Sequence, residues 1–241
     1  MYRVKKDMEE FRNDINRYLE DKKKVKEILD EMEKMQAGFI EFCKNYNEEN
    51  SLEYLKKFIK NQMPCPGAVS VGIAVCNALS TYIEKQVREE DLMEIAVPHK
   101  PTLQMEQELN FLKTLVKIKE EKLKEKQTTE LLKKHYEEYA WVYFYVDDPI
   151  TPFETFIEQN NELIDADLNH LKQKLSEKEK FQEQVDEKIQ KIIEKNSLDP
   201  ELVQLFRKGL YLRIYGESAY GLGNKKSFPH FANIAKKLNL A

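Results

Sequence analysis

The sequence predicts an all-α protein in which long helical hairpins with coiled-coil-like seams pack into a helical bundle. Apolar residues recur at steps of three and four over most of the chain, which is the period of one helix face. Only seven Gly and eight Pro interrupt 241 residues, so turns are few and the helices must be long. Hydrophobic residues make up 41% and charged residues 34% of the chain, a balance typical of folded proteins.

The N-terminal region, residues 1–62, is predicted to form coiled-coil-like helices. Apolar residues that alternate four and three positions apart give its first helix a narrow stripe: Val4, Met8, Phe11, Ile15 and Tyr18. Further apolar stripes run through residues 25–42 and 52–59. The sequence Met-Pro-Cys-Pro-Gly at residues 63–67 should end the region, because proline lacks a backbone N–H and pushes the preceding residue into an extended conformation.

The second predicted region, residues 68–241, is a larger helical domain. Its apolar run from 68 to 79 is about half of the roughly 20 residues that a membrane span requires, so we expect a buried core helix and no membrane segment. Thr102 should cap a charged helix, and Thr151 followed by Pro152 should begin another. These signals divide the domain into several consecutive helices.

We expect a long helical hairpin over about residues 153–195. The apolar stripe that starts at Leu163 slips in phase at residues 176–180, which is consistent with the turn of an antiparallel hairpin. Another helix should follow it, because Asp199 and Pro200 carry the signals of a helix start.

The glycine pair Gly221 and Gly223 is interpreted as a turn before a last short helix over residues 228–240. The segment resembles half of a dinucleotide-binding fingerprint. It lacks the third glycine and the preceding strand that would place a pyrophosphate on a helix N-terminus. A nucleotide site is therefore not predicted here.

Cysteine usage and charge predict a cytoplasmic protein. The cysteines Cys43, Cys65 and Cys76 are an odd number at irregular spacings, and no Asn-x-Ser/Thr acceptor occurs. The charged N-terminus lacks the apolar middle of a secretion signal. Lys and Arg number 39 against 43 Asp and Glu, with the signs interleaved, so the sequence shows no basic footprint for nucleic acid.

Aromatic residues are densest at residues 136–145. Together with an imidazole and an arginine, such rings could line a pocket for an anionic ligand, or they could simply join helices, which a thin core favours. The candidate ligand or docking residues are His135, Tyr139, Trp141, Tyr143, Tyr145, Arg213 and Tyr215. Trp141 is expected to be buried where two helical layers meet.

No catalytic residue, metal site or cofactor is predicted. The cysteines lack zinc spacing, and no serine lies in a nucleophile elbow. Asp167 and His170 supply one carboxylate–histidine pair, whereas a di-iron bundle needs two such pairs and two more glutamates. We therefore do not expect the chain to be catalytic by itself.

Five short motifs occur between residues 90 and 241. They are Ile-Ala-Val-Pro-His-Lys-Pro-Thr at 95–102, His-Tyr-Glu-Glu-Tyr-Ala-Trp-Val-Tyr at 135–143, and the stretches 198–202, 211–215 and 234–240. Together they resemble the helical segment of uncharacterised proteins related to phosphoenolpyruvate synthase and pyruvate phosphate dikinase. The resemblance is weaker before residue 90.

This resemblance implies a module without chemistry of its own. In that family a swivelling domain with a phosphorylatable histidine follows the helical segment and carries phosphate between an ATP site and a pyruvate site. The Gly-rich, Thr/Ser-rich setting of that histidine is absent around all four histidines of this chain: His99, His135, His170 and His230. Gly216 stands where relatives carry a basic residue, which argues against anion binding at that point.

Three functions follow from the sequence as alternatives. The first is a non-catalytic helical module of a phosphoenolpyruvate-utilising, phosphotransferase-like protein, which positions a phosphohistidine or nucleotide-binding domain in the same protein or in trans. The second is a standalone helical scaffold, with homo-oligomers formed through its helical seams. The third is a helical bundle that binds a small ligand.

Overall fold

The structure is a computed structural model that describes residues 21–62, 64–143 and 151–240. Helices account for 85% of these residues and no strand occurs among them, which confirms the predicted all-α class. The helix predicted within residues 1–20 lies outside the described residues. All further structural statements concern the described part of the chain.

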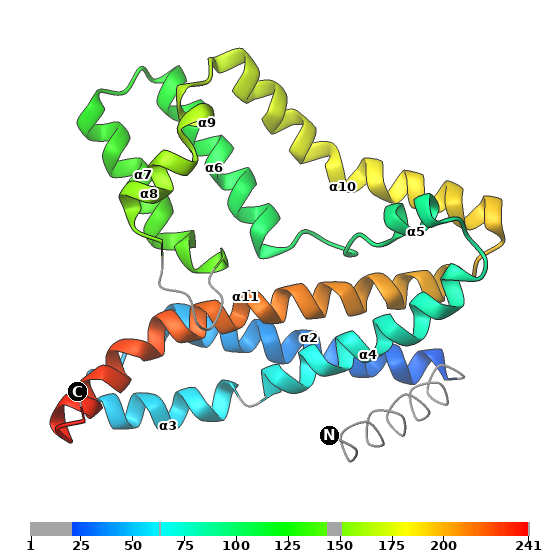
Figure 1. Ribbon diagram of the computed structural model, residues 1–241, viewed down its shortest axis with the longest axis horizontal. Helices are drawn as coiled ribbons and strands as arrows, with labels where there is room; N and C mark the ends of the chain where they lie inside the picture. The colour runs from blue at the N-terminus through cyan, green and yellow to red at the C-terminus, as the bar shows by residue number, and fades with distance from the viewer. Residues whose placement is uncertain (1–20, 63, 144–150, 241) are drawn as a thin grey trace.

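A three-helix bundle forms the centre of the molecule. It consists of α2 (Lys22–Asn45), α4 (Pro64–Glu84) and α11 (Pro200–Lys237), which lie side by side in Figure 1. Ile83 at the end of α4 packs in one cluster with Val25 and Val203, at the starts of α2 and α11. The helix α4 therefore runs antiparallel to the other two.

The closest approach within the bundle joins α4 to α11 and depends on two glycines. A Cβ atom on Gly209 would lie 2.9 Å from the sulfur of Cys76 and 3.0 Å from the carbonyl oxygen of Gly72. A Cβ atom on Gly72 would lie 2.7 Å from the carbonyl oxygen of Gly209. The two backbones come this close because neither helix carries a side chain at the crossing.

The helix α3 (Ser51–Gln62) packs on the C-terminal half of α11. The side-chain amide of Asn233 donates to the Ser51 hydroxyl at 2.9 Å, and the ring of His230 stacks on Tyr54 with 3.8 Å between centroids. These contacts fix the face of α11 that points toward α3.

A second layer of helices stands on the bundle (Figure 1). Its elements are α5 (Glu89–Ile95), α6 (Leu103–Glu120), α7 (Glu125–Tyr139), the 3-10 helix η1 (Ala140–Tyr143), α8 (Phe153–Gln159), α9 (Asn161–Asp165) and α10 (Leu168–Asn196). Leu115, Leu132 and Leu171 belong to a core of its own. The bundle has two apolar clusters, a first that contains Leu29, Leu79 and Val203 and a second that contains Phe39, Phe58 and Leu222. Ile189 of α10 packs in the first cluster and Trp141 of η1 in the second, so the layer is attached to the bundle at both ends.

The predicted hairpin turn at residues 176–180 is wrong. The helix α10 is continuous over 29 residues, and the chain reverses before it, at Ala166. The phase slip has another cause, because Leu171 packs in the core of the second layer whereas Ile189 packs on the bundle. A change of packing partner along one helix thus shifts the apolar stripe without a turn.

The predicted turn at Gly221 and Gly223 is also wrong, because α11 continues through both glycines and through Pro229. The last helix expected over residues 228–240 is the end of α11. A Cβ atom on Gly223 would lie 2.8 Å from the ring of Phe39, so this glycine gives room to a neighbouring aromatic side chain. Close packing, and not a turn, accounts for it.

Two predicted helix starts are confirmed and a third is displaced. The side chain of Thr102 accepts a hydrogen bond at 3.3 Å from the backbone N–H three residues later, and Asp199 accepts one at 2.9 Å from the N–H two residues later. The helix α8 begins at Phe153, one residue after the predicted start. Thr151 does not cap it, and its carbonyl oxygen accepts a 2.6 Å hydrogen bond from the Tyr136 hydroxyl.

The break predicted at residues 63–67 is wrong for residues 64–67, which form the first turn of α4, and the helices on either side share core clusters. Leu29 of α2 and Leu79 of α4 belong to the same cluster. By length and composition alone, one helical stretch of the described residues, Ser51–Glu84, is apolar enough to cross a membrane. One face of α4 is buried in the bundle, as predicted for a core helix.

We predict that Gly209→Ala destabilises the protein by about 1–3 kcal/mol, because the added methyl group must push α4 and α11 apart. The control is Gly38→Ala in α2, where a Cβ atom would meet nothing within 4 Å. There the better helix propensity of alanine should stabilise the fold by roughly 0.8–1 kcal/mol. Urea unfolding measures both, and equal effects of the two substitutions would contradict the close crossing.

Candidate functional site

A buried arginine fixes the segment beside the candidate site. Arg207 of α11 is 2% exposed, and its Nε donates to the carbonyl oxygen of Val97 at 2.9 Å. Its Nη2 donates to the carbonyl oxygen of Pro98 at 3.2 Å and to the carboxylate of Asp186 on α10 at 2.6 Å. One guanidinium therefore ties α10 and the connection between α5 and α6 to the bundle.

A second polar group holds the next residues of that connection. Glu33 of α2 forms ion pairs with Lys100 and with Lys208 of α11. Burial alone would raise the pKa of Glu33, but hydrogen bonds from the two lysines outweigh it and hold that pKa below its ordinary value. Beside it, burial lowers the pKa of His99 to about 4, so this imidazole is neutral at pH 7.

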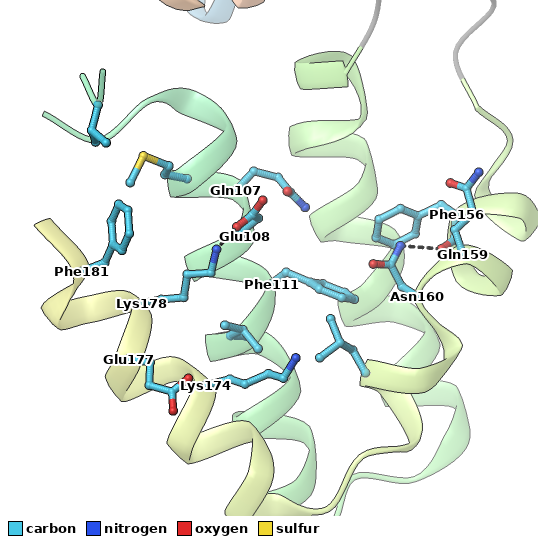
Figure 2. Close-up of a pocket in the computed structure, with 14 residues that line it drawn as sticks. Gln107, Glu108, Phe111, Phe156, Gln159, Asn160, Lys174, Glu177, Lys178 and Phe181 are labelled. Carbon is cyan, nitrogen blue, oxygen red and sulfur yellow. Dashed lines mark hydrogen bonds and ion pairs between the residues drawn. The ribbon is translucent and has the colours of Figure 1, made fainter. Parts of the chain in front are cut away.

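A cleft of about 980 Å³ opens between α6, the α8–α9 pair and α10 (Figure 2). Its volume is at the upper end of the range usual for small-molecule sites, roughly 300–1,000 Å³. The lining residues are Val97, Met105, Gln107, Glu108, Phe111, Leu112, Phe156, Gln159, Asn160, Leu163, Lys174, Glu177, Lys178 and Phe181. Half of these lining residues are apolar, and three of the apolar residues are phenylalanines.

Aromatic rings form the walls of the cleft. Phe111 of α6 and Phe156 of α8 meet edge to face, with 5.5 Å between their ring centroids. Phe181 of α10 is 37% exposed, one of the large apolar side chains that the fold leaves accessible. Such walls favour a ligand with an apolar body, because removing apolar surface from water is the dominant favourable term in binding.

The charged residues of the cleft are not equivalent. Lys178 forms an ion pair with Glu108, which joins α10 to α6. Lys174 forms no ion pair with any described residue, and Figure 2 shows its side chain extending from α10 into the cleft. Glu177 of α10 also lines the cleft without an ion pair to a described residue, and Lys174 is exposed, so the four charged side chains of the lining sum to zero. An anionic ligand group placed at Lys174 itself would still be attracted to its ammonium.

A smaller cavity of about 100 Å³ adjoins the cleft, and Gln107, Phe156 and Gln159 line both. His135 lines this cavity and is 4% exposed. Its Nε2 lies 3.0 Å from the amide nitrogen of Gln107, a donor, so the imidazole accepts there and carries its proton on Nδ1. That Nδ1 makes no hydrogen bond with a described residue.

The structure brings two of the predicted site residues together. The rings of His135 and Tyr139 stack with 4.9 Å between centroids, and the Tyr139 hydroxyl accepts a 3.2 Å hydrogen bond from Asn110. Burial lowers the pKa of His135 to about 4. The imidazole is therefore neutral at pH 7, and its Nδ1 is buried without a hydrogen-bond partner among the described residues.

Trp141 and Tyr215 belong to a different place, the second bundle cluster. Trp141 is 3% exposed, which confirms the prediction of a buried indole, and its Nε1 donates to the carbonyl oxygen of Glu138 at 2.5 Å. Tyr215 packs against this cluster, as the structural interpretation of the aromatic residues expects. The side chain of Tyr143 and all of Tyr145 lie outside the described residues.

Arg213 lines neither of these two cavities, so it does not share one with His135 as the less favoured interpretation of the aromatic residues required. Its Nε lies 3.5 Å from Glu217 one turn later, which confirms the alternative that this arginine pairs with a carboxylate. The separation follows from the fold, because Arg213 belongs to the central bundle and His135 to the second layer.

The residues that define the cleft were missed at the level of sequence. In the sequence, the apolar stripes of the predicted helices include Phe111, Phe156 and Phe181. Lys174 is one of many lysines expected on solvated helix faces. One signal was available: Phe181 lies just past the phase slip at residues 176–180, where α10 changes packing partner. A helix that changes partner leaves side chains between its two contact surfaces, and Phe181 is one of them.

Comparisons with known proteins return nothing: no family model, no curated protein and no solved structure matches this chain. The resemblance to phosphoenolpyruvate-utilising proteins, the partner domain and the cytoplasmic location stay predictions. Among the described residues, no group of three or more His, Cys, Asp or Glu side chains could hold a metal ion.

We predict that Arg207→Met destabilises the protein by about 2–4 kcal/mol, because two buried carbonyl oxygens lose their donor. Arg88→Met is the control, since the Arg88 side chain is 70% exposed and lies 3.9 Å from Asp91. That substitution should change the free energy of unfolding by less than about 0.5 kcal/mol. Thermal and urea unfolding compare the two, and similar effects would show that Arg207 does not hold the layers together.

Stability should also fall as the pH drops from 6.5 toward 5. In this window the unfolded chain protonates His99 and His135 near the ordinary pKa of 6.5, whereas the folded protein, with both pKa values at about 4, does not. Melting temperatures at pH 7, 6 and 5 test this. Replacing both histidines by glutamine should flatten the profile, and the exposed control His170→Gln should leave its slope unchanged.

Proposed function

We propose that this chain is a non-catalytic binding protein whose cleft takes a small organic acid with an extended apolar body. One observation carries the proposal: a cleft of about 980 Å³ walled by phenylalanines contains a lysine without an ion-pair partner among the described residues. This is the third of the functions that the sequence left as alternatives.

The apolar body of the ligand follows from the walls. Phe111, Phe156 and Phe181 come from three different helices and surround the cleft. Each 100 Å² of apolar surface that a ligand removes from water here contributes about 2.5 kcal/mol before the costs of association. A strongly hydrated ligand such as a sugar would leave these walls without a partner.

The acid group follows from Lys174. The charge of Lys178 is already paired with Glu108, so Lys178 contributes little to the binding of a ligand. A carboxylate or phosphate placed at Lys174 would form a charge-assisted hydrogen bond, about 1.5–3 kcal/mol in net stabilisation. Gln159 and Asn160 on the opposite side supply neutral polar groups that can orient the ligand.

Binding without catalysis fits the chemistry of the lining. The cleft residues include no serine, cysteine or histidine, so a Ser–His or Cys–His pair is not present among them. His135 in the adjoining cavity is neutral and offers an N–H donor, a role that orients a polar group.

We expect the full chain to bind decanoate with a measurable heat in titration calorimetry and to bind 1-decanol about tenfold more weakly, because the alcohol has the same body without the charge. Phosphoenolpyruvate carries charge but no extended apolar body, so it should bind more weakly than decanoate. Tighter binding of phosphoenolpyruvate would favour the phosphotransferase-related role predicted from the resemblance.

The lysine is tested by Lys174→Gln, which should weaken decanoate binding about tenfold and leave 1-decanol binding unchanged. Lys180→Gln is the matched control, since Lys180 is exposed on the same helix and does not line the cleft. Saturating decanoate should raise the melting temperature of the unmodified protein and of this control. If both lysine variants bind decanoate equally well, the proposed site is wrong.

A further inference from the structure

The most exposed large apolar side chains gather at one end of the molecule. On α3 they are Leu52 at 55% and Ile59 at 50%, and near the end of α11 they are Phe228 at 72%, Phe231 at 49%, Leu238 at 60% and Leu240 at 76%. Elsewhere among the described residues only Met93, at 65%, is comparably exposed. Since α3 packs on the C-terminal half of α11, both sets lie at the same end, where Figure 1 marks the C-terminus.

The exposed side chains of α11 form a stripe along the helix. Phe228, Phe231 and Leu238 are three and seven residues apart, so they share one helix face. His230 and Asn233 contact α3 from another side of the helix. The stripe is therefore not the surface that packs on α3, and no described residue buries it.

This end of the molecule is basic, although the whole chain carries a net charge of -4. The helix α3 and residues 224–240 carry seven lysines and one glutamate, a formal charge of +6. Glu48 and Glu49 in the loop before α3 reduce this to +4. No acidic residue occurs within 224–240, where Lys226, Lys236 and Lys237 are exposed on the side of the helix away from the stripe.

The charge decides which partner this surface suits. A second copy of the chain would bring the same positive charge against it, so self-association through this end is disfavoured. Phenylalanine and leucine on one side of a helix end, with lysines on the other, are the combination with which amphipathic helices lie in a lipid interface. Anionic headgroups attract the lysines, and the apolar side chains insert below them.

We propose that the end formed by α3 and residues 224–240 binds the surface of a membrane that contains anionic lipids. Phe228, Phe231 and Leu238 enter the interface, and the lysines on the other side of the helix and on α3 reach the headgroups. The chain lies on the membrane without crossing it. This inference is independent of the ligand proposed for the cleft, and it replaces the prediction from the sequence that the protein has no membrane partner.

Flotation of the full chain with vesicles tests the proposal. Binding to vesicles of phosphatidylcholine with 30% phosphatidylserine should exceed binding to pure phosphatidylcholine at least tenfold and should weaken as salt is raised. The double substitution F228E/F231E should lower binding at least tenfold. Because both side chains are exposed, the circular dichroism spectrum should stay helical.

The control is Met93→Glu, which places one negative charge, against the two of F228E/F231E, on a comparably exposed apolar side chain of α5. It should bind anionic vesicles like the unmodified protein. K226E/K236E/K237E should abolish the preference for anionic lipid. Lys174→Gln should leave vesicle binding unchanged, and F228E/F231E should leave decanoate binding unchanged, so failure at one site is distinguishable from failure at the other.

Four results would overturn the proposal. The first is equal binding to neutral and anionic vesicles, or no binding to either. The second is a loss with Met93→Glu as large as that with F228E/F231E. The third is an oligomer in sedimentation that F228E/F231E converts to monomer, which would assign the stripe to a second copy of the chain. Capture by an acidic protein in preference to vesicles would likewise replace lipid as the partner.

Discussion

The arrangement of the two helical layers depends on the buried guanidinium of Arg207. It satisfies the carbonyl oxygens of Val97 and Pro98 and pairs with Asp186, so α11, α10 and the connection before α6 meet at one group. A buried arginine is tolerated only when its donors are paired, which makes the position of all three segments interdependent. Val97 also lines the cleft, so the same interaction that joins the layers shapes the candidate site.

The cleft exists because α10 serves two cores. Its first turns pack in the second layer through Leu171, and its last turns pack on the bundle through Ile189. Between these contacts, ion pairs such as Lys113–Glu179 at 3.2 Å join α10 to α6. Space for a ligand is thus a consequence of attaching one helix to two separate cores.

The two proposed sites differ in physical character. The cleft is concave and walled by aromatic rings, with a single lysine that lacks an ion-pair partner among the described residues, whereas the α3–α11 end is protruding, apolar and basic. A concave site suits one small molecule, and a protruding one suits an extended surface. If both proposals hold, the chain takes an amphipathic acid and rests on a membrane, two functions that share a lipid environment.

The sequence by itself determined the helices and several of their starts. Apolar periodicity is a local property of one helix face, and the caps at Thr102 and Asp199 act within one turn, so both are readable from neighbouring residues. The burial of Trp141 was predicted for a similar reason, since a lone indole among other aromatic rings has few other places in a thin core.

Only the tertiary structure decided what the glycines and the phase slip in the apolar pattern meant. Gly223 looked like a turn and is a site of close packing against Phe39, and the phase slip in α10 looked like a hairpin and is a change of partner. In each case the local signal was present, but its cause lies in a helix far away in sequence. The cleft could not be predicted from the sequence for the same reason. Lys174 differs from other lysines only through the side chains that three separate helices place around it.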